Sequence, residues 1–206
     1  AGPTREKIDP VRYISNKSSG KMGFSLAKAA VDESAIVTLI SGPVTLDTPE
    51  RVNRIDIESA EEMKEHVTAN LSDIDLFIST AAVADFKMKN AEPQKIKKDQ
   101  SKNISLSLEK NEDILKHVSD NNPNLKIVGF AAETENMVDN ARKKLSSKNL
   151  NLIVANDVSD SSIGFDSNNN EVTLITEKEE LKIPKTSKEK VARKIVQFIS
   201  KNILND

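Results

Sequence analysis

Short apolar runs rich in β-branched residues recur along this chain, and helical patterns separate most of them. Four such runs span residues 35–41, 74–79, 126–131 and 150–155. Runs this short and this apolar are typical of strands buried on both faces of a parallel sheet. Parallel neighbours need a crossover connection, which is usually a helix packed on one face of the sheet. This alternation constrains the fold more than any other feature of the sequence.

The intervening segments repeat apolar residues at helical spacing. The expected helices cover about residues 20–33, 58–70, 111–120, 135–147 and 187–204. The second begins with Ser59-Ala-Glu-Glu62, a capping box in which both side chains hydrogen-bond to backbone amides at a helix start. We therefore predict an α/β fold with a doubly wound, mostly parallel, Rossmann-like sheet and right-handed crossovers.

Two regions depart from this alternation. Residues 86–110 are rich in lysine and end in the alternating segment 104–108, so we expect a protruding loop or small β-ribbon there. Another alternating strand is expected over residues 171–176, after the polar turn 166–170. Ala1–Thr4 reads as the turn that follows a strand, so we expect residues 1–206 to form one domain whose first strand lies upstream.

Composition narrows the possible functions. The chain has 30 Lys and Arg residues against 32 Asp and Glu residues. This balance gives no net positive electrostatic field to attract the phosphate backbone of a nucleic acid. The chain has no Cys, which excludes disulfides, thiolate nucleophiles and Cys-ligated zinc. It has only two His, too few for a His-rich metal site. No run approaches the roughly 20 apolar residues of a membrane span, and no secretory start is visible. We expect a cytoplasmic protein that contacts neither membrane nor nucleic acid.

The segment Ser15–Gly23 carries the most chemistry. Gly20 and Gly23 precede or open an apolar helix, and small residues there let backbone N–H groups approach an anion. Ser18 and Ser19 add hydroxyl donors, and Lys17 and Lys21 add positive charge. The segment can be a phosphate cradle or simply a helix cap with a glycine-permitted turn. It matches neither the P-loop nor the G-x-G-x-x-G dinucleotide fingerprint, because Ser15, Met22 and Ser18 occupy required positions.

Several further motifs occur in a specific order. They are residues 1–6, Asp9-Pro-Val-Arg-Tyr-Ile-Ser-Asn16, Ser18-Ser-Gly-Lys-Met-Gly23, Ala81-Ala-Val-Ala-Asp85, Lys95-Ile-Lys-Lys98, Gly129-Phe-Ala-Ala-Glu-Thr134, Ala155-Asn-Asp157 and Gly164-Phe165. Together they closely resemble phosphopantothenate–cysteine ligase (phosphopantothenoylcysteine synthetase) of the bacterial type, the synthetase domain of the bifunctional coenzyme A biosynthesis protein. The resemblance spans nearly the whole chain.

The resemblance implies a reaction in coenzyme A synthesis. The carboxylate of 4′-phosphopantothenate attacks the α-phosphate of CTP, and pyrophosphate leaves. The amine of L-cysteine then attacks the acyl-cytidylate, giving 4′-phosphopantothenoyl-cysteine and CMP. Such chemistry needs orientation, charge compensation and exclusion of water more than a side-chain nucleophile.

The resemblance also assigns roles to residues. Asn16 and Lys95 are the implied catalytic residues, with Lys95 carried on a flap at about 86–110. Ser79 and Glu112 depart from the family pattern, which has glycine in some relatives and often proline at these positions. The implied nucleotide contacts are Ser79, Asp85, Lys95, Asn111, Glu112, Asp113, Ile114, Phe130, Lys144 and Lys148. The implied substrate and phosphate contacts are Arg12, Ser18, Ser19, Gly20, Gly23, Ala81, Ala82 and Asn156.

The implied accessory components follow from the same resemblance. Mg²⁺ is expected with CTP, and no residue is assigned as its ligand because the phosphates and water supply most of its coordination. A homodimer and a fused N-terminal decarboxylase domain are also implied. Two alternatives stay open: an NAD(P)-dependent reductase on a similar sheet, and a nucleotide-binding module without turnover.

Overall fold

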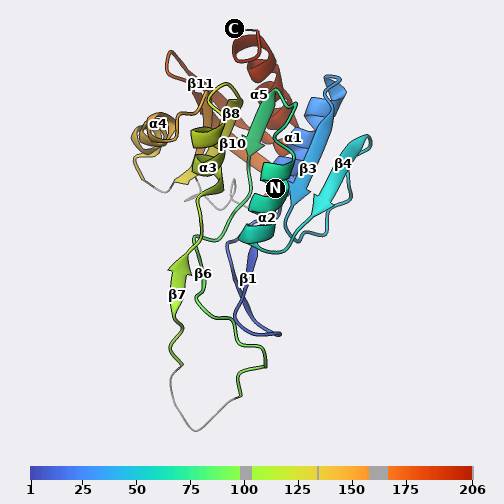
Figure 1. The fold of residues 1–206 in the computed structure, drawn as a ribbon. Helices are drawn as coiled ribbons and strands as arrows, with labels where there is room; N and C mark the ends of the chain where they lie inside the picture. The colour runs from blue at the N-terminus through green and yellow to red at the C-terminus, as the bar shows by residue number, and fades with distance from the viewer. Residues whose placement is uncertain (98–103, 134, 158–166, 206) are drawn as a thin grey trace.

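The computed structural model describes residues 1–97, 104–133, 135–157 and 167–205 (Figure 1). Five α-helices and eleven β-strands lie in these ranges. In chain order they are β1 (Arg5–Lys7), β2 (Tyr13–Ser15), α1 (Lys21–Asp32), β3 (Val37–Ser41), β4 (Val52–Asp56), α2 (Ala60–Ala69), β5 (Leu76–Ser79), β6 (Phe86–Met88), β7 (Leu108–Lys110), α3 (Ile114–Asn121), β8 (Lys126–Glu133), α4 (Met137–Ser147), β9 (Leu152–Asp157), β10 (Asn169–Ile175), β11 (Glu180–Ser187) and α5 (Lys188–Asn202).

The central sheet has the strand order β11-β10-β9-β8-β5. Strands β5, β8 and β9 are parallel, and β10 and β11 add antiparallel strands at one edge. A second parallel pair, β3 with β4, lies beyond β5. The mostly parallel α/β fold predicted from the sequence is therefore confirmed.

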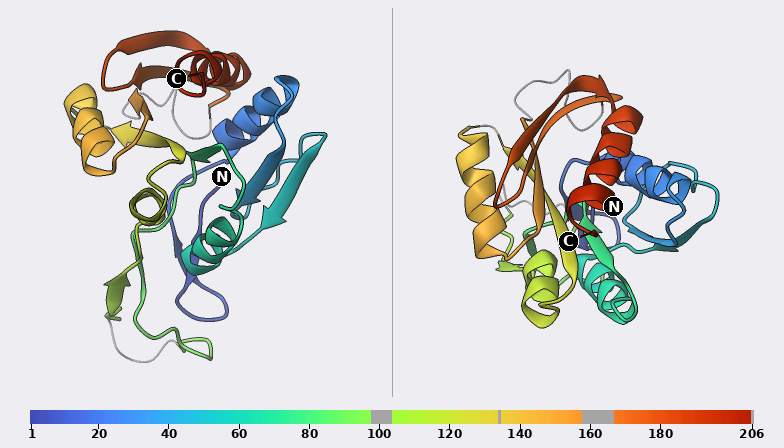
Figure 2. Two further views of the ribbon diagram at one scale, coloured as in Figure 1. Left: turned by 45° about the horizontal axis from the view of Figure 1, so that its top comes forward. Right: turned by 90° about the horizontal axis from the view of Figure 1, so that it is seen from above.

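Helices cover both faces of the sheet (Figure 2). Along β8 and β9, alternate residues point to opposite faces, as strand geometry requires. Val128, Leu152 and Val154 join the core under α1 and α5, whereas Ile127 and Ile153 join the core under α2, α3 and α4. Burial on both faces explains why these strands read as continuous apolar runs.

Residues 1–4 connect the two parallel groups of strands. The Ala1 amino group donates to the Ile40 carbonyl at 2.6 Å, and the Gly42 N–H donates to the Ala1 carbonyl at 2.9 Å. On the other side, Pro3 forms a parallel bridge with Ala82. The chain start thus lies between the carboxyl ends of β3 and β5. Whether a strand lies upstream stays a prediction.

A narrow arm projects from the sheet (Figure 1). It consists of the antiparallel hairpin β1–β2 and the antiparallel ribbon β6–β7. The ribbon expected at 86–110 is present, but its second strand is Leu108–Lys110 rather than 104–108. Residues 104–107 belong to no strand, because they extend past Met88, the last residue of β6 to pair.

The described helices agree with the five expected from periodicity, within about three residues at each end. Strands β1, β2, β4, β6 and β11 are not among the expected strands. Their sequences are short or polar, and β11 carries Pro184 at the edge of the sheet, where an unpaired position tolerates proline. No helix within the described ranges combines the length and apolar character that crossing a bilayer requires.

We predict that Gly42→Ala destabilises the fold. A Cβ atom on Gly42 would lie 1.7 Å from the Pro3 carbonyl oxygen, so the backbone of residues 1–4 would have to move. The free energy of unfolding in urea should fall by about 1–3 kcal/mol, the usual cost of overpacking.

Gly129→Ala is the matched control, because its Cβ would meet only the movable side-chain ends of Leu150 and Leu115, at 2.8 and 3.1 Å. The two substitutions change the unfolded chain equally. Equal losses of stability in both variants would contradict the packing argument.

Candidate functional site

A cavity of about 400 Å³ opens where β5 and β8 end and α1 begins. This is the carboxyl edge of the parallel strands, where open α/β sheets bind ligands. The lining includes nine residues expected from the sequence: Asn16, Ser18, Ser19, Gly20, Gly23, Ala81, Ala82, Phe130 and Asn156. The other lining residues are Lys17 and Lys21, whose charges the cradle interpretation includes, and five to which no role was assigned from the sequence: Met22, Thr80, Ala132, Asn170 and Lys188.

The start of α1 forms one wall of the cavity. Gly20 is the N-cap in the left-handed conformation, with φ of 74°, and no side chain of the described residues caps this helix. The Ser18 hydroxyl accepts the Gly20 N–H at 3.2 Å, which shapes the turn. The first N–H groups of a helix lack intrahelical partners and carry partial positive charge. This geometry suits the phosphate cradle.

Gly23 is small for a second reason. A Cβ atom there would lie 2.5 Å from the Ala1 Cβ and 2.6 Å from the Thr80 hydroxyl. The glycine therefore lets α1 pack closely against the chain start and the end of β5. It positions the helix start over the cavity as well as leaving space within it.

The cavity lining is cationic. It holds Lys17, Lys21 and Lys188, and none of the lining residues in the described part of the chain is Asp or Glu. Lys188 is only 6% exposed and is the first residue of α5, whose cap is the Ser187 hydroxyl accepting the Lys190 N–H. Lys21 donates to the Asn168 side chain at 2.8 Å. A cavity with this lining favours an anionic ligand.

A clamp holds the loop after β5 on the cavity side. The Asn16 side-chain amide donates to the Val83 carbonyl at 2.9 Å, and the Ala84 N–H donates to the Thr4 hydroxyl at 2.9 Å. Asn16 thereby joins the glycine–serine segment to the Ala81–Asp85 loop. Its amide nitrogen carries two hydrogens, so one remains for another acceptor.

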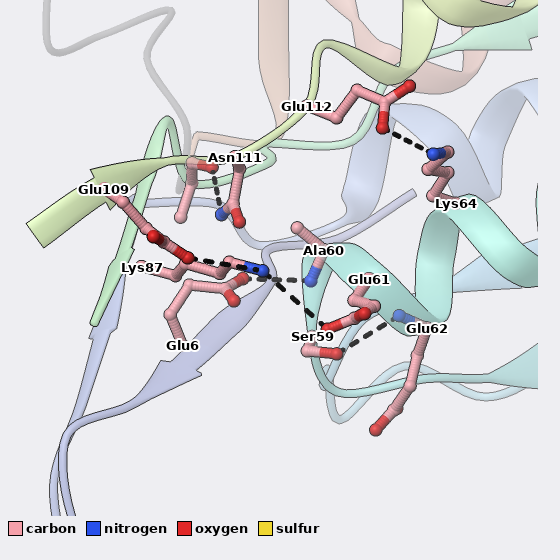
Figure 3. A network of polar contacts seen from close by, with 11 residues as sticks. Glu6, Ser59, Ala60, Glu61, Glu62, Lys64, Lys87, Glu109, Asn111 and Glu112 are labelled. Atoms are coloured by element: carbon pink, nitrogen blue, oxygen red, sulfur yellow. Dashed lines mark hydrogen bonds and ion pairs between the residues drawn. The ribbon is translucent and has the colours of Figure 1, made fainter. Parts of the chain in front are cut away.

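Asn111 holds the same loop from the other side. Its side-chain amide donates to the Ala84 carbonyl at 2.8 Å (Figure 3), and its backbone N–H donates to the Asp85 carbonyl at 2.9 Å. The Asp85 side chain is exposed, and Ser79 is the half-buried last residue of β5. Neither lines the cavity described above.

The start of α3 gathers several of the expected nucleotide contacts. Asp113 is the N-cap, accepts the Lys116 N–H at 3.0 Å, and pairs with Lys148 at 2.7 Å. Burial raises the pKa of the Asp113 carboxyl, but the hydrogen bonds from Lys148 and the Lys116 amide outweigh it, so the pKa is lowered. Ile114 is buried in the core, and Lys144 is half-buried on α4.

Glu112, next to this cap, belongs to an ion-pair network (Figure 3). Its carboxylate pairs with Lys64 of α2 and lies 2.8 Å from the His117 Nδ1 atom. The hydrogen bond from Lys64 is the main cause that lowers the pKa of Glu112. The network ties α3 to α2, and none of its members lines the cavity.

Arg12 and Lys95 lie on the arm. The Arg12 guanidinium pairs with Asp9 at 3.1 Å and donates to the Ile96 carbonyl at 3.3 Å, and it does not line the cavity. Lys95 has an exposed side chain and does not line it either. The expected residues thus form a cavity group, a group at the start of α3, and a pair on the arm.

Some motif residues lie outside the described ranges, namely Lys98, Thr134, Gly164 and Phe165. Within the ranges that are described, no three His, Asp or Glu side chains come together as a metal site would require. The unexpected Lys188 left one signal in the sequence. A lysine in the first turn of a helix opposes the helix dipole, so its placement there favours a role other than helix stability.

Comparisons with known proteins show the family of the chain. Residues 1–203 match the family model of the DNA/pantothenate metabolism flavoprotein C-terminal domain. The coenzyme A biosynthesis bifunctional protein CoaBC of Vibrio vulnificus (strain YJ016) is 50% identical over 201 residues, which cover 97% of this chain and 50% of that protein. CoaBC of Escherichia coli (strain K12) is 46% identical over 204 residues, with the same coverage of each.

A solved structure gives the same result. The crystal structure of the C-terminal domain of a CoaBC protein superposes with a TM-score of 0.84 and 40% identity, covering 100% of this chain and 94% of that one. The chain spans about half the length of the curated relatives it matches. It belongs to the family of the DNA/pantothenate metabolism flavoprotein C-terminal domain.

Proposed function

We propose that this chain is a CTP-dependent phosphopantothenate–cysteine ligase of coenzyme A biosynthesis. The observation that carries the proposal is the cavity in which the start of α1, three lysines and the clamped amide of Asn16 come together without a carboxylate among its described lining residues. Its two anionic substrates, a nucleoside triphosphate and a phosphorylated carboxylic acid, need such compensation of charge. The names of the relatives support a place in coenzyme A biosynthesis.

The reaction has two steps. A carboxylate oxygen of 4′-phosphopantothenate attacks the α-phosphorus of CTP, an O–P bond forms, and the bond to pyrophosphate breaks. The amine of L-cysteine then attacks the acyl carbon of the mixed anhydride, an amide forms, and CMP leaves while the amine gives up a proton. Both steps are governed by how the reactants are held.

The residues of the chain take distinct roles in this proposal. The start of α1 and Lys188 bind phosphate groups in the cavity, and Asn16 donates its remaining N–H to oxygen at the reacting centre. Lys95 brings a compact positive charge on a long stem to the phosphate that is attacked. Asp85 and the segment Asn111–Ile114 hold the nucleotide on the other side of the loop.

Mg²⁺ fits this site as a companion of CTP. The described residues offer no cluster of carboxylates for a resident ion, whereas Mg²⁺ bound to a triphosphate needs few protein ligands. When bound, it offsets the negative charge of the phosphates. The chain's own part is to orient the complex through the lysines and the amides of α1.

The relatives suggest the molecular setting. Their bifunctional names, and a length about twice that of this chain, support a second domain fused to this one, which the proposal takes to be an N-terminal decarboxylase. The proposal also places the protein in the cytoplasm as a homodimer. Mass measurement in solution tests the dimer independently of activity.

The decisive assay supplies CTP, Mg²⁺, 4′-phosphopantothenate and L-cysteine and measures pyrophosphate and CMP. Release of both, each dependent on 4′-phosphopantothenate, is the expected result. Selective binding of NADPH over CTP would favour a reductase, and CTP binding with no product would favour a binding module. Either outcome would overturn the ligase.

Lys95→Ala should slow formation of the acyl-cytidylate on the order of 100-fold, the range found when one preorganised donor is removed from an active site. Pyrophosphate release measured without cysteine isolates this step. Lys89→Ala is the control, because Lys89 is an exposed lysine of the same insertion. If both variants keep the parental rate, Lys95 has no catalytic role.

Asn16→Asp should damage use of the anhydride, because it places a negative charge beside the reacting centre and removes the donor to Val83. We expect kcat to fall on the order of 100-fold or more. The melting temperature, measured in parallel, separates this effect from a general loss of fold. Parental turnover in the variant would refute the assigned role.

Lys188→Met should weaken anion binding in the cavity while keeping the length and apolar stem of the side chain. Calorimetric titration should show the Kd of CTP or of 4′-phosphopantothenate rising about 10- to 100-fold, as loss of one charge-assisted hydrogen bond predicts. Lys190→Met, an exposed position two residues along α5, is the matched control. Unchanged Kd values for both ligands would exclude Lys188 from the site.

A further inference from the structure

The loop at the tip of hairpin β1–β2 holds the insertion that carries Lys95. The Glu92 N–H donates to the Ile8 carbonyl at 2.9 Å. Four residues later, Ile96 donates its N–H to the Asp9 carboxylate at 3.1 Å. Two points of the insertion, one on each side of Lys95, are therefore fixed to the same loop.

Asp9 is an unusual residue for the tip of a hairpin. Its side chain is fully buried, with 0% exposure. One carboxylate oxygen accepts the Val11 and Arg12 N–H groups at 2.8 and 2.9 Å, and the other accepts the Ile96 N–H and lies 3.1 Å from the Arg12 guanidinium. A buried carboxylate is tolerated only when it is paired and hydrogen-bonded in this way.

The energetic balance favours the charged form of Asp9. Burial raises the pKa of its carboxyl. The backbone hydrogen bonds from Val11, Ile96 and Arg12 and the charge of Arg12 lower the pKa by more than burial raises it, so the net shift is downward. The contacts therefore remain in place at neutral pH.

Asp9 and Arg12 together grip one residue of the backbone. Asp9 accepts the Ile96 N–H, and Arg12 donates to the Ile96 carbonyl at 3.3 Å. Both contacts are to backbone atoms of Ile96 and not to its side chain, so they fix the position of the backbone there. Lys95 immediately precedes Ile96, so these contacts also restrict the position of its Cα atom.

The hairpin that provides the grip is itself anchored to the body of the protein. The Ser15 hydroxyl donates to the Thr4 carbonyl at 2.7 Å, and buried Glu6 accepts the Ala60 N–H at 2.9 Å (Figure 3). Asn16 follows β2 directly. One hairpin therefore carries Asn16 by sequence and holds Lys95 through Asp9 and Arg12.

We propose that Asp9 is a positioning residue, which with Arg12 fixes the backbone of Ile96 and so sets the place of Lys95 relative to Asn16. The role rests on the proposed function, because it matters for catalysis only if Lys95 acts on the reacting phosphate.

Asp9→Asn tests this directly. The amide keeps one oxygen for Val11 and Arg12 but presents an NH₂ group to the Ile96 N–H and the Arg12 guanidinium, which are also donors. We expect pyrophosphate release to slow on the order of 10- to 100-fold, as small misplacements of catalytic groups do. The KM for CTP should change little, because the substitution changes neither the cavity nor the nucleotide contacts assigned to Asp85 and the start of α3.

A double-mutant cycle with Lys95→Ala decides whether Asp9 acts through Lys95. In the Lys95→Ala background, Asp9→Asn should cost less than about twofold, because the group that it positions is gone. Equal losses in both backgrounds would overturn the proposal. Asp56→Asn is the control for removing the charge of an Arg-paired aspartate, since Asp56 pairs with Arg54 at 2.7 Å on β4.

Hydrogen exchange provides a readout that needs no activity. The Ile96 amide should exchange faster in Asp9→Asn than in the parent chain, while the amides of β8 and β9 stay protected. Unchanged exchange at Ile96 would refute the grip even if the protein proves to be no ligase. Absence of turnover in the parent chain would instead refute the proposed function, and the exchange result would stand alone.

Discussion

The site depends on which groups form hydrogen bonds with the backbone N–H and C=O groups of the loop after β5. Residues 82–85 leave the sheet, so their polar backbone groups need other partners. Gly2 and Thr4 supply them from the chain start, and Asn16 and Asn111 supply them from two sides of the loop. Because the partners come from three segments, the chain start, the glycine–serine segment and the residues before α3, their contacts with this one loop also fix the glycine–serine segment relative to the start of α3. The cavity and the group around Asp113 are thereby held at a constant separation.

The distribution of charge follows the same division. The described cavity lining has lysines without carboxylates, whereas the carboxylates nearby each hold a specific cation: Asp113 holds Lys148, and Glu112 holds Lys64. A phosphate near α3 would have to compete with Asp113 for Lys148. The contribution of Lys148 to a nucleotide site would then come largely through the geometry of the α3 start. The start of α1 has no side-chain cap from the described residues, so a ligand there need not displace one.

Sequence patterns predicted the elements that are buried in the core, and they missed elements that are held mainly by strand pairing and hydrogen bonds. The helices and the strands β5, β8 and β9 are marked by apolar periodicity, because they contact the core on one face or both. β1 and β2 are three residues each and are held by pairing and side-chain hydrogen bonds, which leave no apolar pattern, whereas β6 and β7 were expected as a ribbon but not with these bounds. In the cavity, the segment 16–23 was predicted because it is contiguous. Lys188 and Asn170 were not, because only the packing of α5 and β10 near α1 brings them there.

Short strands also explain why the arm relies on charged residues. A three-residue pair offers few ladder hydrogen bonds, so it cannot by itself hold a side chain at a defined position. Glu6, Asp9 and Arg12 supply fixed points through buried or partly buried charges bonded to backbone. Such contacts are specific in direction, since each donor has one acceptor, and they involve few atoms. Residues outside the cavity can therefore help to set the geometry of Asn16 and Lys95.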